Sequence, residues 1–184
     1  RAPCPIGGGW GAYYCSAFAI NGKGYVTCGK LGPAQYTNQC WEYNPATNTW
    51  LQRTSFPGAV RYGTYHFVLN GLGYVGLGAD PNAYASDIWA FDPAMNSWSS
   101  IGNFPASARF SGHGFSLLGK GYFVLGTDGG YKDDLFEYDP AFNSWTQRKS
   151  FEGGPRRNGS CFVIGNRAYV GQGKAPDGKK RDLW

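Results

Sequence analysis

The sequence predicts an all-β fold built from repeated four-stranded antiparallel units. Nearly the same phrase occurs three times, as YNPATNTW at 43–50, FDPAMNSW at 91–98 and YDPAFNSW at 138–145. The tryptophans that end these copies are separated by steps of 48 and 47 residues. Short apolar runs and turn residues fill each interval, without helical periodicity. A fixed period of this length indicates a repeat architecture.

Each copy of the phrase has the chemistry of a tight turn. Asp92 and Asp139 can bond to the backbone that follows them, and the next proline fixes φ at the first turn position. Asn96 and Asn143 tolerate the left-handed conformation that closes such a turn. Aromatic residues flank the turn on both sides, so we expect a β-hairpin with a loop of four or five residues.

One complete unit begins at Arg61. YHFVL, YVGLG, IWAF and SWSSI predict four short strands in that order, and the polar loop ADPNAYASD separates the second from the third. A single sheet of this size cannot bury both of its faces, so such units must stack around an axis. The expected architecture is therefore a β-propeller with four-stranded blades.

These recurring features resemble the kelch-repeat family, whose repeats form propeller blades. An arginine opens three units and a tyrosine lies in the second strand of four. The matching residues are Arg61, Arg109 and Arg156; Tyr25, Tyr74, Tyr122 and Tyr169; and Trp50, Trp98 and Trp145. The resemblance extends from about Ala12 to the end of the sequence. The family has two consecutive glycines in each repeat, and this sequence departs from it by keeping only the second of them.

The predicted blades span 12–57, 61–105, 109–152 and an incomplete 156–184, after a lead-in at 1–11. The last unit reaches only its third strand, and three and a half blades do not close a ring. Residues 1–11 could supply the missing strand, although their prolines and glycines disfavour it. Two copies could associate. The favoured interpretation is a stretch of a longer chain whose ring has six or seven blades, as the resemblance implies.

The five cysteines suggest an oxidising compartment. Cys28 and Cys40 stand where the second blade has Leu77 and Ile88, so an apolar cross-strand pair has become a cysteine pair. We predict a Cys28–Cys40 disulfide and a Cys4–Cys15 disulfide, with buried free thiols as the alternative. Cys161 is expected to be free and buried. Disulfides would place the protein outside the cell or at its surface.

The net charge of +5 is concentrated at the C-terminal end. From residue 148 to 184 there are nine Lys and Arg against three Asp and Glu. This predicts either an acidic partner or a solvated basic face. Nucleic acid is not expected, because no series of stacking aromatics accompanies the basic residues. No run approaches the roughly 20 apolar residues of a membrane span.

The sequence offers no catalytic constellation, and we expect no cofactor and no metal. His66 and His113 are one position out of register in neighbouring blades, which predicts opposite strand faces and disfavours a shared metal site. One alternative is a sugar-active propeller enzyme of the oxidase or sialic-acid epimerase type, as some kelch-like proteins are, with its site completed by other residues. Another is a structural packing unit of a surface assembly.

The main functional expectation is a non-catalytic module that binds a protein or glycan. In an up-and-down blade, the loop between strands two and three lies on the same side as the link to the next blade. Candidate binding residues on that side are Tyr36, Tyr84, Tyr131, Arg61, Arg109, Arg156, Lys132, Lys179 and Lys180, with Asp80 and Asn82 as further blade-specific residues. A residue that repeats in every blade can instead support the blade, the arginine by bonding a neighbouring carbonyl and the tyrosine by holding its loop.

Overall fold

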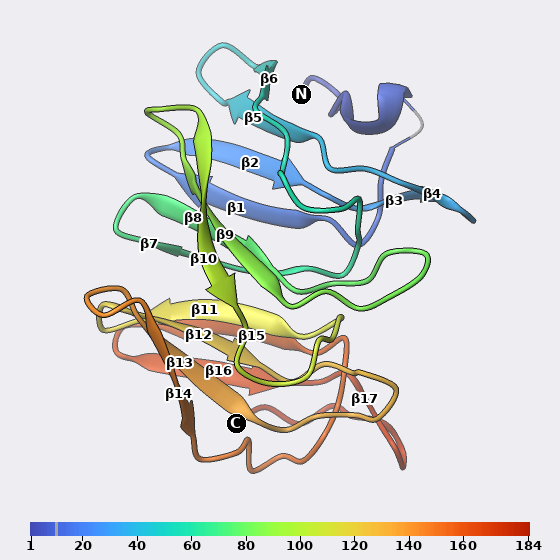
Figure 1. Cartoon of the computed structure of the whole chain (residues 1–184), viewed down its shortest axis with the longest axis vertical. Coiled ribbons are helices and arrows are strands. Elements are labelled where there is room, and N and C mark those ends of the chain that lie inside the picture. Colours follow the sequence, from blue (N-terminus) through green and yellow to red (C-terminus); the bar gives the residue numbers. More distant parts are fainter. Residues whose placement is uncertain (10) are drawn as a thin grey trace.

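The chain folds into a stack of antiparallel sheets, which confirms the predicted all-β class. The computed structural model describes residues 1–9 and 11–184. Three sheets have four strands each, and a fourth has two. Figure 1 shows the four sheets following one another from the N-terminal to the C-terminal end of the chain. We call them blades I to IV.

The strands of the blades have the following bounds. Blade I contains β1 (Ser16–Ile20), β2 (Lys23–Thr27), β5 (Cys40–Asn44) and β6 (Thr49–Arg53). Blade II contains β7 (Tyr65–Leu69), β8 (Leu72–Gly76), β9 (Asp87–Asp92) and β10 (Ser97–Asn103). Blade III contains β11 (His113–Leu117), β12 (Lys120–Val124), β13 (Leu135–Asp139) and β14 (Ser144–Arg148), and blade IV contains β15 (Ser160–Ile164) and β16 (Arg167–Gly171).

Smaller elements lie outside these sheets. The hairpin β3 (Lys30–Gly32) and β4 (Gln35–Tyr36) lies between β2 and β5, and β17 (Lys174–Ala175) and β18 (Gly178–Lys179) follow β16. A short 3₁₀ segment, η1 (Ile6–Gly9), precedes blade I. Within residues 1–9 and 11–184, no helix has the length and apolar character that crossing a membrane requires.

Turn chemistry sets the order of strands within each blade. In blade II, Asn70 and Gly71 both have positive φ, as a two-residue hairpin requires. In the Asp-Pro turn, the Asp92 carboxylate accepts a hydrogen bond from the Ala94 N–H at 2.8 Å, and Asn96 has a φ of 50°. The turn predicted from the repeated phrase is therefore present.

Aromatic side chains hold neighbouring blades together. The first strands β1, β7, β11 and β15 lie side by side (Figure 1). In blade II, Phe67 stacks on Tyr74 with ring centroids 4.7 Å apart, and both rings contact Tyr138 of blade III. Phe67 and Tyr74 are 2% and 4% exposed. Burial of a side chain such as Phe67 contributes about 1.5–3 kcal/mol.

The repeated arginines lie inside the blades. Arg61, Arg109 and Arg156 are 3%, 2% and 0% exposed. Each forms a two-pronged ion pair with an aspartate of the same repeat, and in blade II the distances to Asp87 are 2.6 and 3.2 Å. Burial alone would raise the pKa of Asp87, but hydrogen bonds from Arg61 and from a tryptophan outweigh it and lower the pKa. The arginines therefore support the blades, which is the second of the roles expected for them.

The N-terminal residues follow the path of a link between blades. The Ala2 N–H donates to the Asn48 side chain at 2.9 Å, and the Trp50 indole donates to the Ala2 carbonyl at 3.0 Å. Thr54, in the link from blade I to blade II, makes the equivalent two hydrogen bonds with Asn96 and Trp98 of blade II. Within the described residues, the N-terminal segment thus lies on blade I and adds no strand to blade IV.

The predicted disulfides are not supported, because all five cysteines carry free thiols. Thr27, rather than Cys28, lies opposite Cys40, and Cys28 follows β2 with a φ of 60°. Both thiols are fully buried, and burial raises the pKa of each to about 12. They pack as small apolar groups, which is the alternative that the sequence left open. Cys161 is also free, and it is only partly buried.

Candidate interaction site on the loop face

The loops between second and third strands share one side of the molecule with the links that enter the first strands. Short bridges join the two in each blade, between Tyr62 and Ala79 in blade II, Phe110 and Thr127 in blade III, and Arg157 and the first residue of β17 in blade IV. These loops project to the right in Figure 1, whereas the hairpin turns lie on the opposite side. We call this side the loop face.

A chain of backbone hydrogen bonds connects the links from blade to blade. The Gly63 N–H donates to the Tyr14 carbonyl at 2.9 Å, Ser111 to Gly63 at 2.9 Å, and Asn158 to Ser111 at 2.8 Å. All four residues have left-handed φ values between 52° and 62°. Successive links are therefore joined through their backbones from blade I to blade IV.

The retained glycine of each repeat makes a second connection. Gly29, Gly78 and Gly126 donate their N–H groups to the carbonyls of the next blade's repeated arginine at 2.7, 2.8 and 2.9 Å. Their φ values of 122°, 101° and 104° lie in a region that L side chains rarely adopt. This accounts for the glycine at the second position of the family's doublet.

The predicted loop tyrosines lie against the next blade. Tyr36 of blade I contacts Tyr62 of blade II at 5.5 Å between ring centroids, and Tyr84 of blade II stacks on Phe110 of blade III at 5.3 Å. In blade III, the guanidinium of Arg157 lies over Tyr131 at 5.7 Å. The loop tyrosine of each blade thus meets the residue directly after the next repeated arginine. Sequence reasoning missed this second position, although its place after the arginine was a usable signal.

Further side chains extend this row across the loop face. Lys30 lies between Tyr36 and Tyr62, 5.6 and 5.4 Å from their ring centroids. Tyr14 contacts Tyr62 at 5.9 Å. Tyr14 and Tyr84 remain 52% and 42% exposed. The loop-face row, defined as Tyr14, Lys30, Tyr36, Tyr62, Tyr84, Phe110, Tyr131 and Arg157, is therefore both ordered by mutual contacts and open to a partner.

The other predicted binding residues occupy varied environments. Lys132 pairs with Asp128 at 2.8 Å, and Lys180 pairs with Asp177 at 2.6 Å. Lys179 is exposed. The Asp80 carboxylate accepts two backbone hydrogen bonds at 2.7 Å, one from Asn82 and one from Ala83, and so holds its own loop. Asn82 is exposed at the tip of that loop.

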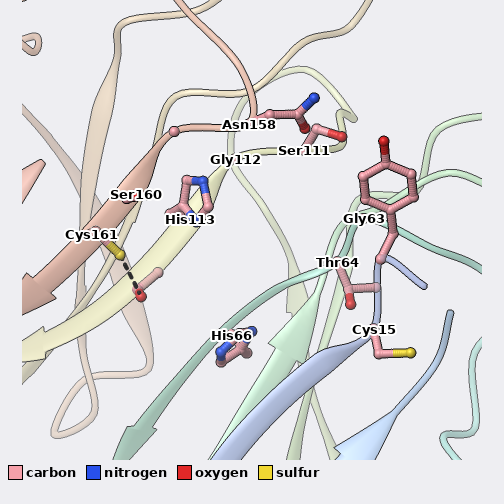
Figure 2. A pocket seen from close by; sticks show the side chains of 13 residues that line it. Cys15, Gly63, Thr64, His66, Ser111, Gly112, His113, Asn158, Ser160 and Cys161 are labelled. Atoms are coloured by element: carbon pink, nitrogen blue, oxygen red, sulfur yellow. Dashed lines mark hydrogen bonds between the residues drawn. The ribbon is translucent and has the colours of Figure 1, made fainter. Parts of the chain in front are cut away.

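A polar cavity of about 420 Å³ lies beside the inner strands. Residues from all four blades line it, and Figure 2 shows His66, His113, Thr64, Asn158 and Cys161 around it, with Cys161 hydrogen bonded to a backbone carbonyl. Burial, followed by the proximity of His113, lowers the pKa of His66 to about 4. Burial also lowers the pKa of His113. Both imidazoles are therefore neutral at neutral pH.

The two histidines turn toward different neighbours. His66 Nδ1 lies 3.1 Å from the Ser16 hydroxyl of blade I, whereas His113 lies beside the Gly159 backbone of blade IV. Ser16 is fully buried, and an imidazole with a lowered pKa is a weak base, so this Ser–His contact offers no accessible nucleophile. Among the described residues, no group of three or more His, Cys, Asp or Glu side chains is placed to hold a metal ion.

Comparison with known proteins agrees with this architecture. A sequence model of the KLHDC2/KLHL20/DRC7 Kelch-repeats domain matches residues 10–173. Among solved structures, "Structure of YjhT" aligns with a TM-score of 0.75 at 20% identity, covering 88% of this chain and 59% of that chain. The chain thus spans about three fifths of the length of that structure, and the similarity concerns the fold alone. No curated protein sequence matches the chain.

Proposed function

Because the chain belongs to the kelch-repeat family of β-propellers, we propose that it is an interaction module that binds a protein partner on its loop face. The observation that carries this proposal is the loop-face row. Its tyrosines are held in place by contacts between blades, yet Tyr14 and Tyr84 keep about half of their surface exposed. Rigid, partly exposed tyrosines bind partners at low entropic cost.

The arrangement of the rings favours a protein over a glycan. Tyr62 is contacted by Tyr14, Tyr36 and Phe110, and Tyr84 has one face against Phe110. Much of the ring surface that would stack on a sugar is therefore occupied by the protein itself. The hydroxyl groups of these tyrosines suit hydrogen bonds with a peptide.

The polar cavity supports a second candidate, a sugar-active enzyme. His113 Nε2 is a buried nitrogen without a hydrogen-bond partner among the described residues. A substrate hydroxyl entering the cavity would supply that partner. A His113→Ala variant that kept peptide binding but lost binding of a monosaccharide, measured by calorimetry, would favour this alternative.

An exported or cell-surface location remains part of the proposal. Because all five cysteines are free, disulfides do not support this location. The support comes from the Asn-Gly-Ser glycosylation acceptor sequence at Asn158, whose side chain is exposed. A glycosidase-sensitive mass shift of protein made in a eukaryotic secretory host, abolished by Asn158→Gln, tests whether this site is used. A role as a packing unit of a surface assembly would use the same exposed loops.

Selection of peptides on the folded chain tests the proposed function. A displayed random-peptide library is screened, and the affinities of selected peptides are measured by fluorescence anisotropy. Tyr84→Ala should weaken binding at least tenfold, a loss of about 1.4 kcal/mol. Phe142→Ala is the matched control, because Phe142 is a 79% exposed aromatic in the β13–β14 turn on the opposite side. Peptides that bind the Tyr84 variant as tightly as the parent chain would contradict a loop-face site.

A further inference from the structure

A basic cleft of about 500 Å³ lies at the blade IV end of the loop face. Its lining contains four cations and no acidic residue. The lining residues are Asn158, Gln172, Gly173, Lys174, Lys179, Lys180 and Arg181. We call this the blade IV cleft. It shares Asn158 with the polar cavity, so the cleft and the cavity adjoin at this residue.

Two lysines of the cleft face each other directly. Lys174 of β17 is paired in register with Lys179 of β18, and both side chains are exposed. Like charges that are directly opposite on antiparallel strands repel each other and destabilise the hairpin. In the other blades, the equivalent pairs are Lys30–Tyr36, Ala79–Tyr84 and Thr127–Tyr131, so the pair of like charges belongs to blade IV alone.

The cleft has little internal compensation for this charge. Lys180 pairs with Asp177, and Asp182 is engaged by the buried Arg156. Across the described part of the chain, Lys174, Lys179 and Arg181 have no ion-pair partner within 4.0 Å. The equivalent Lys30 of blade I differs, because two tyrosine rings flank it. Within the described residues, three of the four cations of the blade IV cleft are thus not offset by a carboxylate.

We propose that the blade IV cleft binds an acidic peptide segment of the partner. This inference rests on the proposed function and names the chemistry of the bound segment. Three of the four cations are lysines, which act as flexible point charges and suit several carboxylates spaced along a chain. A site for one phosphate would instead use the planar forks of arginines. The adjoining loop-face row gives the same peptide a second contact region, at Arg157 and Tyr131.

Labelled ten-residue peptides of defined charge test the proposal. In one peptide Glu alternates with Gly, and in the matched peptide Gln replaces every Glu. Fluorescence anisotropy should show that the Glu peptide binds the chain at least tenfold more tightly than the Gln peptide. Raising the salt concentration should weaken the Glu peptide's binding, because the contact is between exposed charges.

Two variants locate the contact. Lys179→Glu should reduce binding of the Glu peptide at least tenfold while leaving the melting temperature equal or higher, because Glu at this position would face Lys174. Arg167→Glu is the charge-matched control, since exposed Arg167 lies in β16 beside the hairpin turn on the opposite side. It should leave the affinity nearly unchanged.

Three results would overturn the inference. These are equal affinities for the Glu and Gln peptides, an equal loss in the Arg167 and Lys179 variants, and displacement of the Glu peptide by a sulfated oligosaccharide that binds more tightly. A failure of this inference alone can be told apart from a failure of the proposed function. If library peptides bind at Tyr84 but are uncharged and insensitive to Lys179→Glu, the loop-face module stands and the acidic partner is wrong.

Discussion

Gly121 of blade III lies so close to Phe67 of blade II that a β-carbon at position 121 would be 2.3 Å from the phenylalanine ring. The same relationship joins Gly73 to Phe18, at 2.4 Å. A phenylalanine from one blade therefore occupies the space above a second-strand glycine of the next. This contact sets the distance between blades, and so it also sets the spacing of the loops that form the proposed site.

We expect Gly121→Ala to destabilise the fold by about 1–3 kcal/mol, because the added methyl group must displace the Phe67 ring. Gly24→Ala is the matched control in blade I, where the nearest atom to an added β-carbon is the Tyr43 Cβ at 3.7 Å. Its effect should be within about 1 kcal/mol of zero. Urea unfolding measures both. Equal destabilisation would show that the packing of Phe67 on Gly121 is not the cause.

The buried arginines give a second prediction about stability. Arg109→Ala leaves Asp134 partly buried without its cation, and breaking such a pair costs about 3–5 kcal/mol. Arg148→Ala removes a surface ion pair with Glu137 that water screens, and it should lower the melting temperature only slightly. Thermal unfolding followed by near-ultraviolet circular dichroism separates the two variants. Similar melting temperatures would contradict the structural role of Arg109.

Stability should fall on acidification before the carboxylates titrate. Burial holds the pKa of His66 near 4 in the folded chain, whereas the unfolded chain binds this proton near 6.5. Between these values the unfolded state carries the extra proton, so the free energy of unfolding falls as the pH falls, by up to about 1.4 kcal/mol per pH unit. His113 acts in the same direction. Above pH 6.5 this effect should be absent.

His66→Gln should flatten the dependence of unfolding free energy on pH between about pH 6.5 and 4. Urea titrations at several pH values measure the slope for the parent chain and the variant. A slope that is unchanged by the substitution would show that His66 is not buried in its neutral form.

The cysteines should behave as five buried or partly buried thiols. Burial raises the pKa of Cys28 to about 12 and that of Cys161 to about 11, so few thiolates exist at neutral pH. Alkylation of the unfolded but unreduced chain should add five labels, and brief alkylation of the folded chain should leave Cys28 and Cys40 unlabelled. Mass spectrometry counts the labels. Three or fewer labels after unfolding would show that at least one disulfide is present.

Much of the fold was accessible from the sequence because the chain repeats itself. Three aligned copies of the turn, one Asn-Pro and two Asp-Pro, made the number and order of strands predictable, although no single strand was decisive by itself. The repeats also misled in one case. Cys28 and Cys40 do replace a pair of buried apolar residues, but that pair is not directly opposite across the strands. Comparison of the repeats shows which residues occupy equivalent positions. The distance between two such residues depends instead on the register in which their strands pair.

The backbone network of the candidate site has no sequence signature. Tyr14, Gly63, Ser111 and Asn158 are four different residue types in one left-handed conformation. Their N–H and carbonyl groups form the connection between blades, so their side chains vary freely. The position of Phe110 after a repeated arginine was a usable signal, but its stacking with Tyr84 crosses from one blade to the next and depends on how the blades stack.

Hydrogen–deuterium exchange on the chain, with and without the tightest selected peptide, tests the central claim most directly. If the loop face is the binding surface, bound peptide should slow exchange in the loops at 79–85, 128–133 and 174–181. The hairpin turns at 94–96, 118–119 and 141–143 should exchange at the same rate as in the unbound chain. Protection confined to those turns, with the loops unchanged, would place the binding surface on the opposite side and contradict the account.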